Sequence, residues 1–192
     1  MPYTAAGKNS MLDHLGTEIL YAGLFDEAAA LTSVTGVATT DLLTKTSHGL
    51  TNGNLVVLRS LTGGAGLVEE FPYYVVGVSG NDFQLSQVSG GSAVNFTTDI
   101  SSVSVVKLVE VSGGSPAYAR KSIAWNAAVD GSMDDSTNGA EFDCPAGAVI
   151  NYAGFFSALT NGTLYGIDPV TEETFGAQGT YTLTDADLDL NS

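Results

Sequence analysis

The segment 130–141 has the residue types and much of the spacing of a calcium-binding loop. Oxygen-bearing side chains fall at positions 1, 3, 5, 9 and 12 of that pattern, and Asp130, Asp134 and Glu141 supply the carboxylates. Position 6 is Asp135, although the sharp turn of such a loop needs glycine, and no flanking helices are expected. We therefore expect a solvated loop between strands, with Asp130, Asp134 and Glu141 as weak candidates for a metal site.

The other groups that could do chemistry are dispersed along the chain. His14 and His48 fall in different predicted domains, and the single cysteine, Cys144, has apolar neighbours that favour a buried position. The adjacent carboxylates 69–70 and 172–173 diverge on an extended chain, which makes them poor acid/base partners. The sequence contains no nucleophile elbow, phosphate loop or dinucleotide fingerprint. These patterns predict a protein that is not an enzyme and uses no cofactor.

Two neighbouring cations, Arg120 and Lys121, stand out in a very acidic chain. On a strand they point to opposite faces, so one of them can pair with a carboxylate either inside the protein or across a subunit interface. We treat Arg120 and Lys121, together with Tyr73, as candidate interface residues. A receptor contact is the exposed alternative for the two cations.

Composition narrows the class of protein further. The 192 residues include 23 glycines and carry a formal charge of -15, and only 14% of them are charged, while 44% are hydrophobic. An acidic chain lacks the basic surface of a nucleic-acid-binding protein. The sequence has no run of about 18 apolar residues, so no membrane span is predicted, and the N-terminus does not look like a signal peptide. We expect no nucleic-acid or membrane partner.

One helix is expected, at the N-terminus. Thr4 can cap it, Gly16 can end it, and Met11, Leu12 and Leu15 form the stripe that packs onto a sheet. A strand over 19–25 and a single helical turn over 27–31 follow. Further strands are expected over 55–58, 73–78, 83–86, 93–96, 103–108, 118–125, 141–144, 149–156, 163–167, 179–184 and 185–190.

The last of these strands alternates Asp185, Asp187 and Asp189 with apolar residues, so that the carboxylates share a hydrated face. Turn signals every 8–12 residues are typical of small sandwiches and barrels. The fold class is therefore mainly β: two small antiparallel β-sandwich or barrel domains, with the N-terminal helix packed on the outer one.

Several motifs resemble those of a family of small tailed-bacteriophage proteins labelled structural or tail-fibre-like. The resemblance covers roughly 1–26 and 110–192 and is carried by MPYTAAGKN at the start, EVSGGSPAYARK from 110 and ETFGAQGTYTLTDADL from 173. The middle of the chain resembles small β modules embedded in tail and fibre proteins, through 48–56, 72–76, 81–86 and 90–91. Asn54 departs from that module, which more often has Asp there.

The resemblance implies an insertion. Shorter relatives would join the first strand to the EVSGG motif through one loop, whereas about 80 residues intervene here. We therefore predict an inserted β domain over 33–109 and a discontinuous outer domain made of 1–32 and 110–192. Loop tips tolerate insertions, and this arrangement requires residues 26 and 110 to be close in space.

The function implied is that of a non-enzymatic structural protein of a tailed-phage virion, associated with the tail tip or tail fibre. It would act by self-assembly and by docking onto other virion proteins, with a homotrimer as the expected oligomer. Two alternatives stay open. One is a capsid decoration protein on the head exterior, and the other is a host-surface carbohydrate-binding module that uses Tyr73, with Tyr74 and Phe83 expected mostly in the inserted core.

Overall fold

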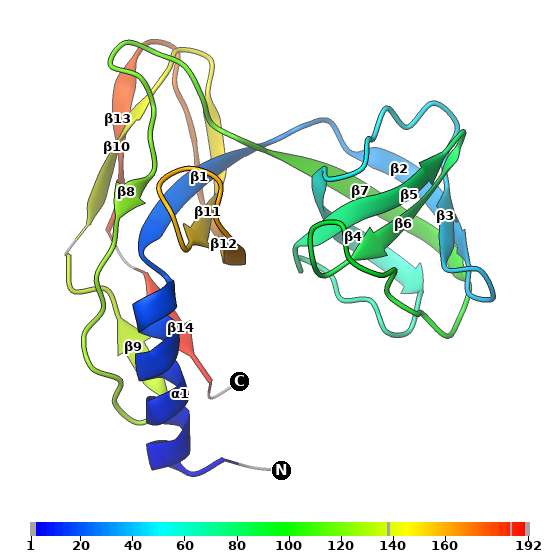
Figure 1. Ribbon diagram of the computed structural model, residues 1–192. Coiled ribbons are helices and arrows are strands. Elements are labelled where there is room, and N and C mark those ends of the chain that lie inside the picture. Colours follow the sequence, from blue (N-terminus) through cyan, green and yellow to red (C-terminus); the bar gives the residue numbers. More distant parts are fainter. Residues whose placement is uncertain (1–2, 138, 185, 191–192) are drawn as a thin grey trace. The chain divides into compact units, whose positions relative to one another are not determined.

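The computed structural model describes residues 3–137, 139–184 and 186–190 and divides into two compact units (Figure 1). Unit 1 comprises Met1–Asp26 and Glu110–Ser192, and unit 2 comprises Glu27–Val109. The protein is mainly β, with one N-terminal helix, a six-stranded antiparallel barrel and small two-stranded sheets. None of the helices among the described residues is long and apolar enough to cross a membrane.

Unit 2 is the barrel. Its strands follow the order β7-β2-β3-β6-β5-β4, every pair is antiparallel, and β4 also pairs with β7, which closes the ring. A closed ring leaves no strand edge unpaired. The strands are β2 (Leu31–Val37), β3 (Leu42–Thr44), β4 (Leu55–Gly63), β5 (Tyr73–Ser79), β6 (Asp82–Ser86) and β7 (Ile100–Glu110), whose last residue belongs to unit 1.

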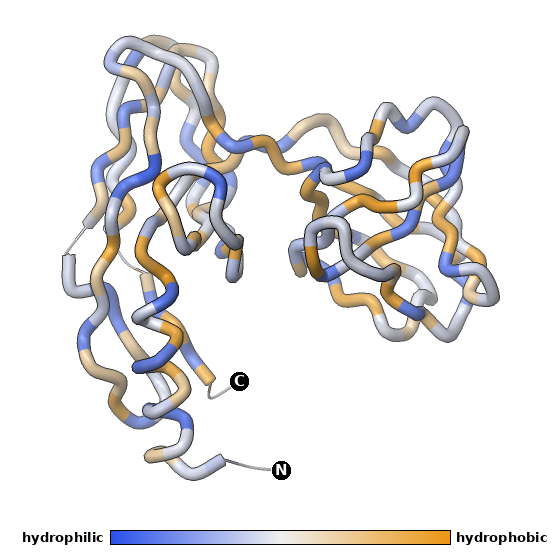
Figure 2. Tube along the Cα trace, in the orientation of Figure 1, coloured by the Kyte–Doolittle hydropathy of each residue, from blue (hydrophilic) through white to orange (hydrophobic). Residues whose placement is uncertain are grey.

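Alternation along these strands fills the barrel with side chains. Tyr73 and Val75 point inward from β5 and are fully buried, whereas Tyr74 between them is half-buried. In Figure 2 the barrel strands carry apolar stretches interrupted by polar residues. The expected strand over 93–96 does not form. The segment is irregular, and Phe96, which is buried in the barrel core, donates its N–H to Asp41 Oδ1 at 3.1 Å.

Unit 1 contains one larger sheet and two short ribbons. In the larger sheet, β11 lies between β1 and β12, and β8 also pairs with β1. β10 pairs with β13, and β9 pairs with β14. The bounds are β1 (Tyr21–Glu27), β8 (Lys121–Ser122), β9 (Ser132–Asp134), β10 (Ala140–Cys144), β11 (Val149–Phe156), β12 (Leu164–Thr174), β13 (Gly179–Leu183) and β14 (Asp187–Asp189).

The core of unit 1 joins the larger sheet to the β10-β13 ribbon. Leu24 of β1 and Phe155 of β11 belong to the same apolar cluster as Phe142 and Cys144 of β10. Cys144 is fully buried, which confirms the expectation for this residue. The predicted strand over 118–125 shrinks to the two residues of β8, because the backbone N–H of Tyr118 bonds within a turn, to Gly113 O at 2.7 Å.

Helix α1 (Ala5–Glu18) begins as predicted, with Thr4 Oγ1 accepting the N–H of Gly7 at 3.2 Å. The expected stop at Gly16 is wrong, because the helix continues to Glu18. Gly16 is instead a point of close packing, where a Cβ would lie 2.9 Å from Met133 Cε. Leu12 is buried against Met133 of β9. The helix therefore packs on the β9-β14 ribbon, with Met11 left exposed.

The chain passes from unit 1 to unit 2 and later returns. Within each unit, the outgoing and the returning segment are hydrogen-bonded to each other. In unit 1, Val111 donates its N–H to Leu24 O at 3.0 Å, and in unit 2, Ala28 donates its N–H to Lys107 O at 2.9 Å. Residues 28–30 are irregular, so the predicted helical turn over 27–31 is wrong. The sequence placed the start of the inserted segment at 33, which lies inside β2, whereas unit 2 begins at Glu27.

Candidate functional site

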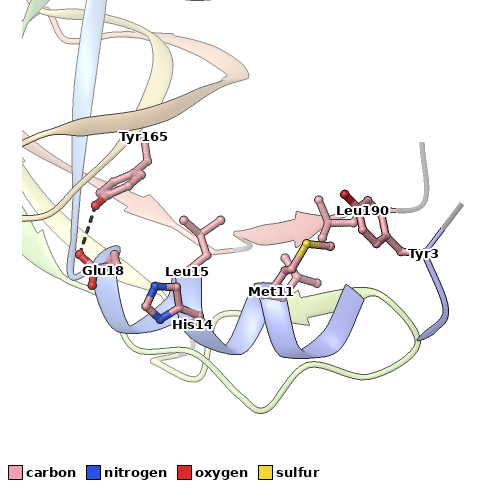
Figure 3. A pocket seen from close by; sticks show the side chains of 8 residues that line it. Tyr3, Met11, His14, Leu15, Glu18, Tyr165 and Leu190 are labelled. Atoms are coloured by element: carbon pink, nitrogen blue, oxygen red, sulfur yellow. Dashed lines mark hydrogen bonds between the residues drawn. The ribbon is translucent and has the colours of Figure 1, made fainter. Parts of the chain in front are cut away.

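An open groove runs along α1 in unit 1 and has a volume of about 670 Å³ (Figure 3). One wall comes from the helix, and the other comes from β12 and from the residue that follows β14. The lining is mostly apolar and consists of Tyr3, Met11, Leu12, His14, Leu15, Glu18, Tyr165 and Leu190.

Exposed apolar side chains gather at this groove. Among the described residues, twelve large apolar side chains are exposed, and four of them line it: Tyr3, Met11, Tyr165 and Leu190. Isolated exposed apolar residues are normal on a protein surface, but a contiguous patch marks an interaction site. Met11 is exposed, so its predicted place in the stripe that packs onto a sheet is wrong, whereas Leu15 packs partly against the unit 1 core.

One carboxylate stands at the rim of the groove. Tyr165 Oη donates a hydrogen bond to Glu18 Oε2 at 3.3 Å, and the two side chains face each other in Figure 3. Loss of hydration and the neighbouring Glu18 carboxylate raise the pKa of the Tyr165 phenol. The hydrogen bond places the Tyr165 hydroxyl beside the Glu18 carboxylate at the rim.

Unit 1 carries most of the protein's negative charge. Fifteen of the 21 acidic residues and three of the six basic residues belong to it, which gives -12 of the total -15. Two of these three cations already face carboxylates of the same unit, Arg120 at Glu110 and Lys121 at Asp143. Glu18 is the acidic residue that lines the groove.

Arg120 forms the internal ion pair that was one of its two expected roles. Its Nε and Nη2 donate to the two carboxylate oxygens of Glu110, both at 2.7 Å, and its side chain is only 9% exposed. Nη1 donates to the carbonyls of Ala158 and Asn161, and the guanidinium lies 3.3 Å from the centre of the Phe156 ring. Lys121 Nζ lies 3.5 Å from Asp143 and is partly exposed.

The assignment of Tyr73 as an interface or glycan-binding residue is wrong. Its side chain is fully buried in the barrel, its Oη accepts the N–H of Val68 at 2.9 Å, and burial raises its pKa. Phe83 is fully buried as well, as the sequence indicated. The expectation that Tyr74 rather than Tyr73 lies in the core is wrong, because the period of two along β5 turns Tyr73 inward and leaves Tyr74 half-buried.

The weak calcium-loop candidates are distributed over separate elements. Asp134 lies on β9 and Glu141 on β10, while Asp130 sits in the turn before β9. Asp135 Oδ1 accepts the N–H of Thr137 at 2.7 Å, a local turn contact. Among the described residues, no group of three or more His, Cys, Asp or Glu side chains is placed to hold a metal ion. Two residues of the predicted patterns, Asn138 and Asp185, lie outside the described residues.

Two titratable groups have environments that the sequence did not reveal. Asp168 of β12 lines a small cavity together with Asp187; partial loss of hydration and then the Asp187 charge raise its pKa. His48 is buried in unit 2, where its Nδ1 accepts the N–H of Leu50 at 2.9 Å and its ring lies 5.1 Å from that of Phe83. His14 lines the α1 groove, so the two histidines belong to different units.

Comparison of the chain with known protein families, with curated proteins and with solved structures finds no match in any of the three.

Proposed function

We propose that this chain is a non-enzymatic structural protein of a tailed-phage virion, associated with the tail tip or tail fibre, and that it acts by docking onto other virion proteins. The observation that carries the proposal is the apolar groove along α1, where exposed Met11, Tyr165 and Leu190 meet. Exposed apolar surface of this kind favours a contact with another protein. The resemblance of the terminal motifs to tailed-phage proteins supports the location.

The strand edges make the groove the better docking surface. The barrel of unit 2 is closed, so it offers no free edge. The outer strand of the unit 1 sheet, β12, contains Pro169 and the charged Glu172 and Glu173. Proline and charge on an edge strand discourage pairing with another strand. Assembly through side chains of the groove is therefore favoured over extension of a sheet.

The two units suggest a division of tasks. We assign unit 1 as a small sandwich-type virion domain, with the β12-β11-β1-β8 sheet against the β10-β13 ribbon, and unit 2 as an accessory module inserted through one of its loops. A closed trimer would present the same groove three times to a symmetric neighbour.

The location is tested by counting copies in purified phage particles that carry the gene for this chain. Gel densitometry against the major capsid protein gives a few copies per particle for a tail component. Hundreds of copies would instead establish the capsid decoration protein, and absence from the particle would overturn the virion assignment. Zymography on host peptidoglycan should show no clearing, and clearing by the pure chain would contradict the non-enzymatic part.

A further inference from the structure

We propose that the α1 groove accepts an amphipathic, basic segment of another protein, whose apolar side chains fill the groove and whose Lys or Arg pairs with Glu18. This inference rests on the proposed docking function and names the chemistry of the partner. Three observations carry it: the shape of the groove, the origin of its walls and its charge.

The groove is built to hold apolar side chains. Leu12 is 1% exposed and packs against Met133. Met11 and Leu15 line the groove, and Met11 is 39% exposed (Figure 3). Leu190 and Tyr165 stand on the opposite wall. Because the walls come from three separate elements packed on one core, the groove exists before a partner binds.

Charge selects among the possible occupants. Unit 1 carries -12, and the Glu18 carboxylate lines the groove, where it accepts a hydrogen bond from Tyr165. Asp189 is exposed on β14 and directly precedes Leu190. A second copy of this chain would bring the same negative charge to the contact, and like charges disfavour association. A segment with Lys or Arg beside its apolar residues is attracted and oriented by the same field.

The test uses the methionines as probes. The chain has three methionines, of which Met11 lines the groove and Met133 is 2% exposed in the core. The full chain is labelled with [methyl-¹³C]methionine, and the Met11 signal is assigned with the M11L variant. The probe is a synthetic 14-residue peptide with Leu at helical i, i+4 spacing and Lys elsewhere, and its control carries Glu in place of Lys.

We expect the Lys peptide to shift the Met11 methyl signal and to leave that of Met133 in place, whereas the Glu peptide shifts neither. Glu18→Gln should weaken binding of the Lys peptide about threefold, because a rim ion pair contributes little. Leu190→Gln should weaken it about tenfold, because apolar contact is lost. The matched control is Glu141→Gln, which makes the same charge change at the exposed position of β10 and should leave the affinity unchanged.

Several results would overturn the proposal. One is a Met11 signal that does not respond to the Lys peptide, and another is equal binding of the Lys and Glu peptides. Equal weakening of Lys-peptide binding by Glu18→Gln and Glu141→Gln would also do so, because it would mean that the attraction is not specific to Glu18. A Met11 signal that shifts with protein concentration alone would assign the groove to a second copy. The readout is independent of particle counts, so the partner chemistry and the virion location fail separately.

Discussion

At the scale of single residues, Arg120 joins three segments of unit 1. It lies before β8, pairs with Glu110, covers Phe156 and donates to two carbonyls of the loop after β11. The sequence indicated that Arg120 and Lys121 point to opposite faces, but not which of them is internal. The partner, Glu110, is ten residues away along the chain, and only the fold brings the two together.

Arg120→Ala should lower the free energy of unfolding of unit 1 by about 3 kcal/mol, because Glu110 and two carbonyls lose their donor in a largely buried place. The single tryptophan, Trp125, donates its Nε1–H to Ile19 O at 2.9 Å and lies in unit 1, so its fluorescence in urea reports that unit. The control, Lys121→Ala, should cost about 0–1 kcal/mol because its ion pair is partly exposed. Equal effects of the two variants would contradict the internal role of Arg120.

Asp168 predicts a pH-dependent effect. Its pKa is raised above the ordinary 3.8, so the folded state holds the proton more tightly than the unfolded state. This contribution to stability is fully present below that value and is lost as the pH rises through the folded-state pKa. Asp168→Asn should therefore raise the Tm at pH 7, by a small amount because solvent screens the carboxyl, and the difference should vanish near pH 3. A larger gain in acid than at neutral pH would show that the sign is wrong.

At the scale of elements, close packing between neighbouring strands determines which glycines can be replaced by larger residues. Gly154 on β11 faces the ring of Phe25 on β1, and Phe25 stacks at 6.0 Å on Phe156. A Cβ at Gly154 would overlap the Phe25 ring and approach Leu164 Cδ1 to 3.3 Å. The sequence predicted a strand over 149–156, but it did not show that one of its glycines is required by a ring from another strand.

Gly154→Ala is expected to destabilise unit 1 by about 1–3 kcal/mol, because an overpacked core must move its neighbours. Gly166 on the paired strand β12 is the matched control, since nothing lies within 4 Å of a Cβ built there. Gly166→Ala should change the stability by less than about 0.5 kcal/mol. The comparison is made by urea unfolding followed at Trp125, and a neutral Gly154→Ala would refute the packing argument.

Most strands were predictable, the short β3 and β9 were not predicted, and the two over-predicted segments share a cause. Period-two patterns and turn residues located strands such as β4, β5, β6 and β11 within a few residues. The segments 93–96 and 118–125 have strand-like composition, yet their backbones bond to side chains and loops elsewhere. The groove was not predictable either, because Met11 looks like a core residue until the packing of α1 on β9 is known.

At the scale of the whole molecule, unit 2 is inserted into a chain whose flanks already meet. Val111 donates its N–H to Leu24 O, both in unit 1, so the ends left by removing the barrel are adjacent. The resemblance of the terminal motifs suggested the insertion, while closure of the barrel by β4 and β7 could not be read from local patterns because it joins distant strands.

Replacing residues 27–109 by a linker of about four Gly/Ser residues should leave unit 1 folded, since a short loop closes at low entropic cost. We expect a cooperative urea transition at Trp125, within about 2 kcal/mol of the full chain. A variant with the same linker inserted after Gly80, a β5-β6 turn residue with open space around it, controls for the linker. Loss of the cooperative transition in the deletion variant alone would contradict the independence of unit 1.

A cryo-EM map of the whole phage particle would show both where this chain is located and what occupies its groove. We expect density for both units at the tail, in a few symmetric copies, with a basic amphipathic segment of a neighbouring protein seated along α1 between Met11 and Leu190. A particle without this chain, or with the chain present and the α1 groove open to solvent, would contradict this expectation.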